Sequence, residues 1–483
     1  MALATVGGLD WPYDGDHFRD IAQAQTALQG HPLADPFYAG EWVWYNPLVP
    51  WLVALGAWLS GAPSPLVHVQ SGPWLNLLGP VAFYLLGVRL AGRLAAFISL
   101  ALLLFVNCDT APSLTCATYS PWLFVASFAQ GLFFFGVLAL DRAARSGSRQ
   151  TAAAAGAVAG LTFLAHTGPA LILGGIALLT LPRRSLVIAG AAALAVASPF
   201  VWAIAVHYRL HVLNATPMAW SWPPLTVSGF PVTLRENAVV LMAAAGGLFV
   251  IRHRVMYAWM GVAALLLALA LSRDIVPSLP ALVPTFHFWR YVLAGATLLA
   301  GALAATAIER VVRGYALAIV PVVLIAAVVA LPHYRNRFDF LYGRGVAAGR
   351  SSDLSKTATF LRKSTPPDAV VLGSRGRAQG GRCHGQLVQS LRRCRTANRC
   401  ARAAAATGGG SRYRPVQCTR GRVACHACGR HGTGGMRGHG RRRIAAAVPV
   451  WRGVCVRARQ QGRAVRSQPW ITSSSRGGPS LHG

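Results

Sequence analysis

Long apolar segments follow one another through residues 66–331, separated by short polar connections. A helix needs roughly 17–25 apolar residues to cross a bilayer, and most of these segments approach that length. The pattern predicts an all-α polytopic membrane protein with about ten transmembrane helices. The expected spans are residues 66–88, 91–107, 120–140, 153–166, 169–182, 185–206, 237–251, 255–272, 286–308 and 315–331.

Composition agrees with this class, because the 483-residue chain is 54% hydrophobic and only 12% charged. Soluble domains carry about a quarter charged residues. The basic residues of the spanning region fall in every second connection, as cytoplasmic loops do. They are Arg89/Arg93, Arg142/Arg145/Arg149, Arg183/Arg184, Arg252/Arg254 and Arg310/Arg313. The alternate loops, and all residues after 331, are therefore expected on the outer face of the plasma membrane.

Residues 1–65 are expected to form an outward loop before the first predicted span. Its apolar segment 47–59 has both ends on the outer side, so it is interpreted as an interfacial helix beside Trp42, Trp44 and Tyr45. Residues 1–46 would have to cross the membrane with no span before them. A first transmembrane helix is therefore expected to be missing.

The same loop contains YDGDHFRDIAQAQ, in which Asp14, Asp16 and Asp20 surround His17 and Arg19. From residue 16 onward the pattern predicts an amphipathic helix, with Asp16 and Asp20 on the side opposite the apolar stripe. One interpretation is a solvated helix face with an aspartate near its N-cap. The other is a general base that takes a proton from an attacking hydroxyl. An Asp-Gly-Asp can also hold a divalent cation, Mg or Mn, through oxygen ligands.

The run DGDHFRDIAQAQTALQGHPLADPFYAGEWVWYNPLVPWLVALGAWLSG resembles the first outward loop of the GT-C membrane glycosyltransferases. That superfamily includes protein O-mannosyltransferases, aminoarabinose transferases and the catalytic subunit of oligosaccharyltransferase. The order is the same: an acidic motif, an amphipathic helix, a Pro-rich aromatic turn and an interfacial helix. The resemblance covers roughly residues 9–373. It implies sugar transfer from a polyprenyl-phosphate donor to a lipid, glycan or protein acceptor, with Asp14 or Asp16 as the base.

The resemblance also implies polar residues gathered at the outer face. In FHFWRY, His287, Arg290 and Tyr291 share a helix face, and a guanidinium suits a donor phosphate. Arg290 is the expected phosphate ligand, with His287 and Tyr291 beside it; its alternative role is to snorkel to the headgroups. His166 and Asp109 are further candidates, with packing and a loop position as their alternatives. His17 and Asp20 complete the candidate set.

Other chemistries find no support in residues 1–373, which contain no Gly-rich phosphate loop after a strand, no Gly-X-Ser-X-Gly and no His-Glu-X-X-His. A transporter or lipid flippase is the rival class, but such proteins more often show internal repeats and polar residues at the bilayer midplane. A third alternative is an inactive, truncated or frameshifted product. Residues 332–373 are expected to begin an outward α/β domain, with a helix from Asp353 and a strand at 369–372.

Residues 374–483 differ from everything before them, with 23 Arg, seven Cys and no Lys, Asp or Glu. They show no sustained hydrophobic periodicity. A disordered, frameshifted tail is the expectation, because GC-rich codons read out of phase yield Arg, Gly, Ala, Pro and Cys. A basic tail can bind nucleic acid or anionic lipid, but its expected outward location disfavours nucleic acid as a partner.

Overall fold

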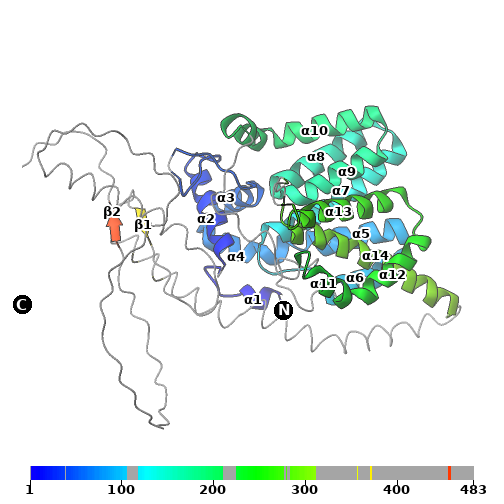
Figure 1. Cartoon of the computed structure of the whole chain (residues 1–483). Helices are drawn as coiled ribbons and strands as arrows, with labels where there is room; N and C mark the ends of the chain where they lie inside the picture. The colour runs from blue at the N-terminus through cyan, green and yellow to red at the C-terminus, as the bar shows by residue number, and fades with distance from the viewer. Residues whose placement is uncertain are drawn as a thin grey trace, which may run out of the picture. The chain divides into compact units, whose positions relative to one another are not determined.

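The computed structural model describes residues 2–12, 14–38, 40–105, 118–209, 225–276, 279, 283–311, 356, 360, 370–372 and 455–457. The chain divides into two units, Met1–Phe360 and Leu361–Gly483. Helices make up most of the described part of the first unit (Figure 1), with an isolated β-bridge between Ala34 and Trp42 in the first loop. This unit contains every described residue of the expected site.

The helices of the first unit coincide with most of the apolar segments, as Figure 1 shows. They are α1 (Ala2–Val6), α2 (Gly15–Leu28), α3 (Leu48–Ser60), α4 (Ser64–Leu75), α5 (Leu78–Ala91), α6 (Arg93–Phe105), α7 (Val125–Ser146), α8 (Arg149–Ala165), α9 (Thr167–Thr180), α10 (Arg183–Trp202), the π-helix η1 (Ala203–His207), α11 (Phe230–Glu236), α12 (Ala238–Val250), α13 (Arg254–Ser272) and α14 (Thr285–Val311).

Helix α14 lies at the centre of the bundle, packed against α6, α12 and α13. Aromatic side chains fill the core around it. The rings of Tyr291 and Phe133 have centroids 4.4 Å apart, and Trp259 donates from Nε1 to the carbonyl oxygen of Tyr291 over 3.2 Å. Edge-to-face contacts among such rings stabilise a core beyond the area they bury. This packing fixes the first turn of α14 relative to its neighbours.

Described helices cover nine of the ten predicted spans, and residues 315–331 lie outside the described part. Within that part, five helices are long and apolar enough to cross a membrane, or six if the bent pair α11–α12 is one span. This is the composition of a multi-pass membrane protein. The count of about ten spans stays a prediction.

The first predicted span differs from expectation, because it is interrupted between α4 and α5. Pro80 has no N–H to bond the carbonyl of Asn76, and this carbonyl accepts the N–H of Gly79 at 3.1 Å instead. The Asn76 side chain is buried and donates to the carbonyls of Ser120 and Trp122, at 2.8 and 2.7 Å. These bonds tie the break between α4 and α5 to the segment before α7.

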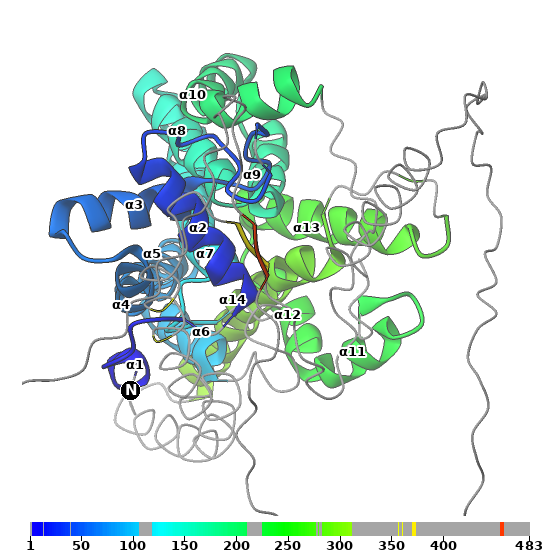
Figure 2. The same cartoon turned by 90° about the vertical axis from the view of Figure 1, so that its left-hand side faces the viewer.

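Helices α2 and α3 lie across one end of the bundle, and Figure 2 shows α2 in front of it. The amphipathic helix expected from residue 16 is confirmed, with Ile21 buried and Asp16 exposed as predicted. Two of the predicted positions are wrong. Asp20 is buried with Ile21 and Ala24, whereas Leu28 is exposed. Asp20 can be buried because Arg19 lies beside it and compensates its charge in an ion pair. Segment 47–59 is helical as α3; its place at the membrane interface stays a prediction.

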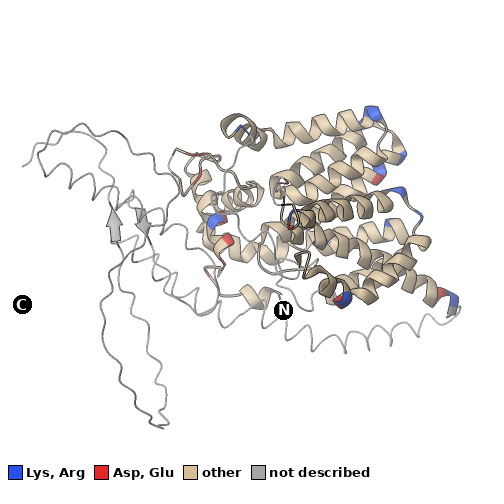
Figure 3. Ribbon diagram, in the orientation of Figure 1, with Lys and Arg blue, Asp and Glu red and all other residues tan. Residues whose placement is uncertain are grey.

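Lys and Arg gather at the end of the bundle away from α2 (Figure 3). One buried acid anchors part of this end. Asp141 of α7 accepts from Arg89 of α5 at 3.0 Å and from Arg145 at 2.9 Å, and lies 3.2 Å from Nε2 of His253 beside α13. These pairs join three helices. A buried carboxylate needs such partners to be tolerated in the interior.

Several expectations fall outside the described residues: Asp109, most of residues 312–369, and nearly all of residues 374–483. Lys356 and Phe360, within the expected helix from Asp353, are helical. In the second unit, the expected strand is confirmed as β1 (Val370–Leu372). It pairs antiparallel with β2 (Cys455–Arg457), Val371 opposite Val456. Strand β2 is an exception to the expected disorder of the tail.

Candidate functional site

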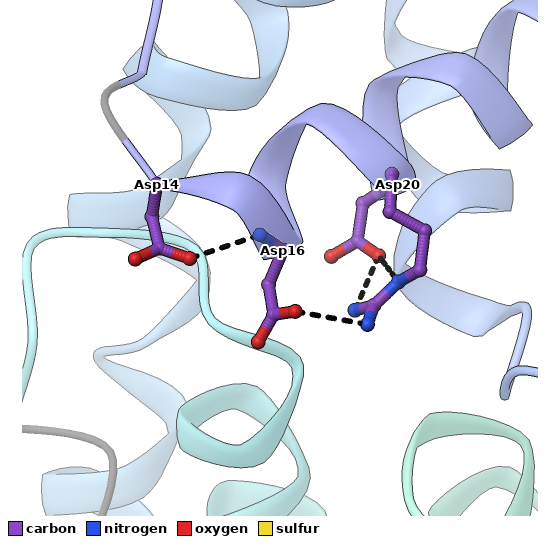
Figure 4. Close-up of polar contacts among 4 residues, drawn as sticks. Asp14, Asp16 and Asp20 are labelled. Carbon is purple, nitrogen blue, oxygen red and sulfur yellow. Dashed lines mark hydrogen bonds and ion pairs between the residues drawn. The ribbon is translucent and has the colours of Figure 1, made fainter. Parts of the chain in front are cut away.

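The acidic motif forms the first turn of α2 (Figure 4). Asp14 is the N-cap: its Oδ1 accepts the backbone N–H of Asp16 over 2.9 Å. This satisfies one of the N–H groups that a helix leaves without partners at its start. The Asp16 side chain is 57% exposed. Of the two candidate bases, Asp14 therefore holds the helix start and Asp16 faces outward from it.

Arg19 bonds two carboxylates of the motif, those of Asp16 and Asp20. We call Asp16, Arg19, Asp20 and Tyr45 the Arg19 cluster. Nε and Nη2 of Arg19 donate to Oδ1 of Asp20 at 3.0 and 2.8 Å, and its Nη1 donates to Asp16 at 3.1 Å. The guanidinium also lies 4.2 Å from the centroid of the Tyr45 ring. A planar fork suits this combination of bidentate pairing and cation–π stacking.

Burial and neighbouring charges shift the pKa values of Asp20, Arg19 and the adjacent His17. Burial raises the pKa of Asp20 to about 6, and Arg19 opposes that shift. Burial alone would lower the pKa of Arg19, but Asp20 and Asp16 hold it above its usual value. Burial, with the charge of Arg19, lowers the pKa of His17 to about 3. At neutral pH Asp20 and Arg19 thus form an ion pair beside the neutral imidazole of His17.

A tether joins this loop to the bundle. Asn46, next to Tyr45, donates from Nδ2 to the carbonyl oxygen of Phe163 in α8 at 2.6 Å and to the hydroxyl of Thr167 in α9 at 3.3 Å. These acceptors flank His166, at the junction where α8 ends and α9 begins. The expected break of the chain at His166 is confirmed, and Asn46 holds the first loop against it.

His166 and His287 meet at this junction, with ring centroids 4.2 Å apart. Nδ1 of His166 accepts the N–H of Gly168 at 3.1 Å, so the neutral ring carries its proton on Nε2 and can donate there. Arg19 of α2 lies over the Tyr45 ring, and Asn46 beside Tyr45 bonds the α8–α9 junction. The structure thus brings α2, the α8–α9 junction and the start of α14 to one site.

The remaining candidates lie deeper. Arg290 is only 1% exposed, and the neighbouring Tyr291 is buried in the aromatic core. His17 is buried against Phe124, with ring centroids 4.3 Å apart. The other candidate, Asp109, is not among the described residues. The roles assigned to all these residues stay predictions.

Two residues near the site were missed by the sequence interpretation. His68 of α4 is buried 4.9 Å from His17, centroid to centroid, and neither of its ring nitrogens has a hydrogen-bond partner among the described residues. A histidine inside an apolar segment is itself a signal, because polar groups at membrane depth are rare. Asn46 gave no local signal, because its partners are 117 and 121 residues away.

A divalent cation, Mg or Mn, is the one cofactor that the sequence suggests. In the described ranges, no group of three or more His, Cys, Asp or Glu is placed to hold a metal ion. The carboxylates of the motif do not fit one as they stand: Asp16 and Asp20 bond Arg19, and Asp14 accepts a backbone N–H. The guanidinium supplies the positive charge that a cation would bring. Arg19 therefore balances the charge of these carboxylates without a metal ion.

Comparisons with known proteins were made on both sequence and structure. No family model and no curated protein matches the chain. Among solved structures, ArnT from Cupriavidus metallidurans bound to undecaprenyl phosphate matches with a TM-score of 0.51 and 16% identity, covering 78% of this chain and 80% of that one. The archaeal oligosaccharyltransferase AglB from Archaeoglobus fulgidus, in complex with an inhibitory peptide and a dolichol-phosphate, matches at a TM-score of 0.46 and 13% identity, covering 74% of this chain and 55% of that one. The expected resemblance is confirmed at the level of architecture: the first of these matches shows that the chain has a GT-C-like fold.

Proposed function

We propose that this protein transfers a sugar from a polyprenyl-phosphate donor to an acceptor hydroxyl at the site formed by α2, the α8–α9 junction and α14. One observation carries the proposal: at one end of a GT-C-like fold, an exposed carboxylate and a group of cationic and imidazole side chains converge. The ArnT structure of the same fold is bound to undecaprenyl phosphate. A fold alone does not assign a chemical activity, so the proposal rests on the residues of the site.

Asp16 is the proposed general base. It is more exposed than Asp14, whose Oδ1 is engaged as the N-cap. The acceptor oxygen forms a bond to the anomeric carbon, and the bond from that carbon to the phosphate oxygen breaks with its electron pair on the phosphate. The acceptor proton passes to Asp16. Asp14 is a positioning residue, because it fixes the turn that carries Asp16.

The leaving phosphate gains negative charge as this bond breaks, and fixed donors lower the barrier most when they are in place beforehand. Nε2–H of His166 is a donor whose orientation is set by the Gly168 N–H. His287 packs against His166 at a tilted angle, and Arg290, one turn further along α14, brings a positive charge. We assign these three residues to the phosphate. Tyr291 supports the first turn of α14 from the core.

The test uses the full chain in proteoliposomes with a panel of polyprenyl-phosphate sugars, and measures release of polyprenyl phosphate. Asp16→Asn is expected to lower release at least about 100-fold, the contribution typical of a general base. Asp10→Asn, an exposed aspartate outside the motif, is the matched control and keeps full activity. Retained release in both Asp16→Asn and Asp14→Asn would overturn the assignment. Addition of EDTA is expected to leave release unchanged.

We further propose that the site lies on the outer face of the plasma membrane. The arginine-rich connections lie at the opposite end of the bundle from α2, as cytoplasmic loops do (Figure 3). Asp10→Cys and Arg93→Cys provide reporters at the two ends. In intact cells, a membrane-impermeant thiol reagent is expected to label the first above the background of the parent chain and not the second. The reverse labelling would contradict this orientation.

A further inference from the structure

A groove lies between α8 and α10, at the arginine-rich end of the bundle and away from the proposed catalytic site. The two helices run side by side in Figure 1. The groove has a volume of about 760 Å³. Its lining consists of two arginines, one amide and three apolar side chains: Arg149, Gln150, Ala153, Arg184, Val187 and Ile188.

Small residues set the depth of this groove. Gly156 of α8 approaches α10 so closely that an added Cβ would lie 2.1 Å from the carbonyl oxygen of Ala189. Gly160, one turn further on, meets Ala193 in the same way, at 2.6 Å. This spacing of small residues lets membrane helices pack backbone to backbone. Beside this close helix contact, the small side chain of Ala153 leaves a hollow in the surface between α8 and α10.

The groove is positively charged at one end and apolar along its wall. Arg149 begins α8, Arg184 is the second residue of α10, and both are exposed. Among the described residues, neither guanidinium has an ion-pair or hydrogen-bond partner. Helix N-termini add partial positive charge at the same place. Val187, 70% exposed, and Ile188 form the wall on α10, a helix whose apolar surface is mostly outside the bundle.

We propose that this groove binds an anionic phospholipid of the adjacent bilayer leaflet. The phosphate lies between Arg149 and Arg184, and an acyl chain follows Val187 and Ile188 along α10. A soluble anion would use the guanidinium groups but leave the apolar wall uncovered. A zwitterionic lipid would cover the wall but bring no net charge. Basic pockets between membrane helices on the cytoplasmic side recognise anionic headgroups in this way.

The test is native mass spectrometry of the full chain in detergent, with equal amounts of phosphatidylglycerol and phosphatidylcholine. Wild-type protein is expected to retain phosphatidylglycerol selectively. A juxtamembrane arginine contributes a factor of about five to affinity, so Arg149→Ala with Arg184→Ala should weaken retention about thirtyfold. Arg93→Ala with Arg142→Ala, exposed arginines at the same end but outside the groove, should leave retention near that of the wild type.

A second pair of variants tests the apolar wall. Val187→Asp places a negative charge beside the proposed lipid and should reduce retention strongly, whereas Val239→Asp, on an α12 residue that is 77% exposed, should not. Equal losses in both arginine pairs would overturn the site in favour of general attraction to a basic surface. Full displacement of the lipid by millimolar inorganic phosphate would overturn the lipid as occupant.

Discussion

Asn46 donates a hydrogen bond to the carbonyl oxygen of Phe163 across 117 residues of sequence, at 2.6 Å. The donor belongs to the loop that carries the acidic motif, and the acceptor to the last turns of α8. His166 ends that helix and faces His287 of α14. This one amide therefore aligns the two halves of the proposed active site: the carboxylates of α2 and the phosphate-binding residues of the bundle.

Asn46→Ala should lower the free energy of unfolding by about 1–2 kcal/mol, because it leaves the Phe163 carbonyl without its partner. It should also weaken sugar transfer more than the loss of stability explains, since the two halves of the site lose their alignment. Chemical denaturation and the release assay measure both effects. Asn237→Ala is the control: Asn237 is also half-buried and donates to a carbonyl, but to Thr233 within its own helical segment. Equal activity losses in both variants would contradict the tether.

Arg19→Ala should destabilise the protein by about 3 kcal/mol, because the buried carboxylate of Asp20 loses its partner. The double variant Arg19→Ala with Asp20→Asn should recover more than half of that loss, since no uncompensated charge remains. A double-mutant cycle on unfolding free energies gives the coupling directly. Additive effects would show that the two side chains are not a pair.

The pH dependence of the unfolding free energy should distinguish the contribution of Asp20 from that of His17. The raised pKa of Asp20, about 6, stabilises the folded state fully below its ordinary value, and this contribution is lost as pH rises through 6. The lowered pKa of His17, about 3, stabilises the protein above the ordinary histidine value, and this contribution declines as pH falls below that value.

Because the two pKa shifts have opposite signs, variants of Asp20 and His17 should show opposite changes of stability with pH. From pH 5 to pH 7, the stability of Asp20→Asn relative to wild type should rise by about 1 kcal/mol, and that of His17→Phe should fall by about 2 kcal/mol. Unfolding free energies of the purified protein in detergent, measured at several pH values, provide the comparison. Slopes of the same sign in both variants would contradict the assigned environments.

Gly156→Leu should force α8 and α10 apart, because even a Cβ at this position meets the Ala189 carbonyl oxygen at 2.1 Å. Overpacking of this kind costs about 1–3 kcal/mol or more. Gly174→Leu, in α9, is the matched control, since a Cβ there meets nothing within 4 Å. Thermal unfolding in detergent should show a large decrease in Tm for the first variant and little change for the second. Similar shifts would mean that the close helix contact is not stabilising.

Much of the fold was predictable from sequence, because long apolar segments have few alternatives to helices in a membrane. The helix of the acidic motif and an aspartate near its N-cap were predictable for a local reason: the residues that cap a helix adjoin it. The break at His166 was equally local, since Pro169 and Gly168 mark it.

The errors concern side chains whose surroundings come from distant segments. Asp20 was placed on the polar side of α2, but Arg19 and the neighbouring helices make its burial possible. The buried side chain of Asn76 finds its acceptors on carbonyls 44 and 46 residues away. His68 packs on His17 from another helix. Such contacts depend on the tertiary arrangement, so hydrophobic periodicity along the chain does not reveal them.

The most direct test of the central claim is binding of polyprenyl phosphate by the full chain, measured by thermal shift against the matching polyprenol, which lacks the phosphate. This readout does not depend on which sugar is transferred. The account predicts stabilisation by the phosphate alone, and its loss in His287→Gln and Arg290→Gln but not in Arg310→Gln, at the far end of α14. Equal stabilisation by both lipids, or an undiminished shift in both site variants, would contradict a phosphate site at the start of α14.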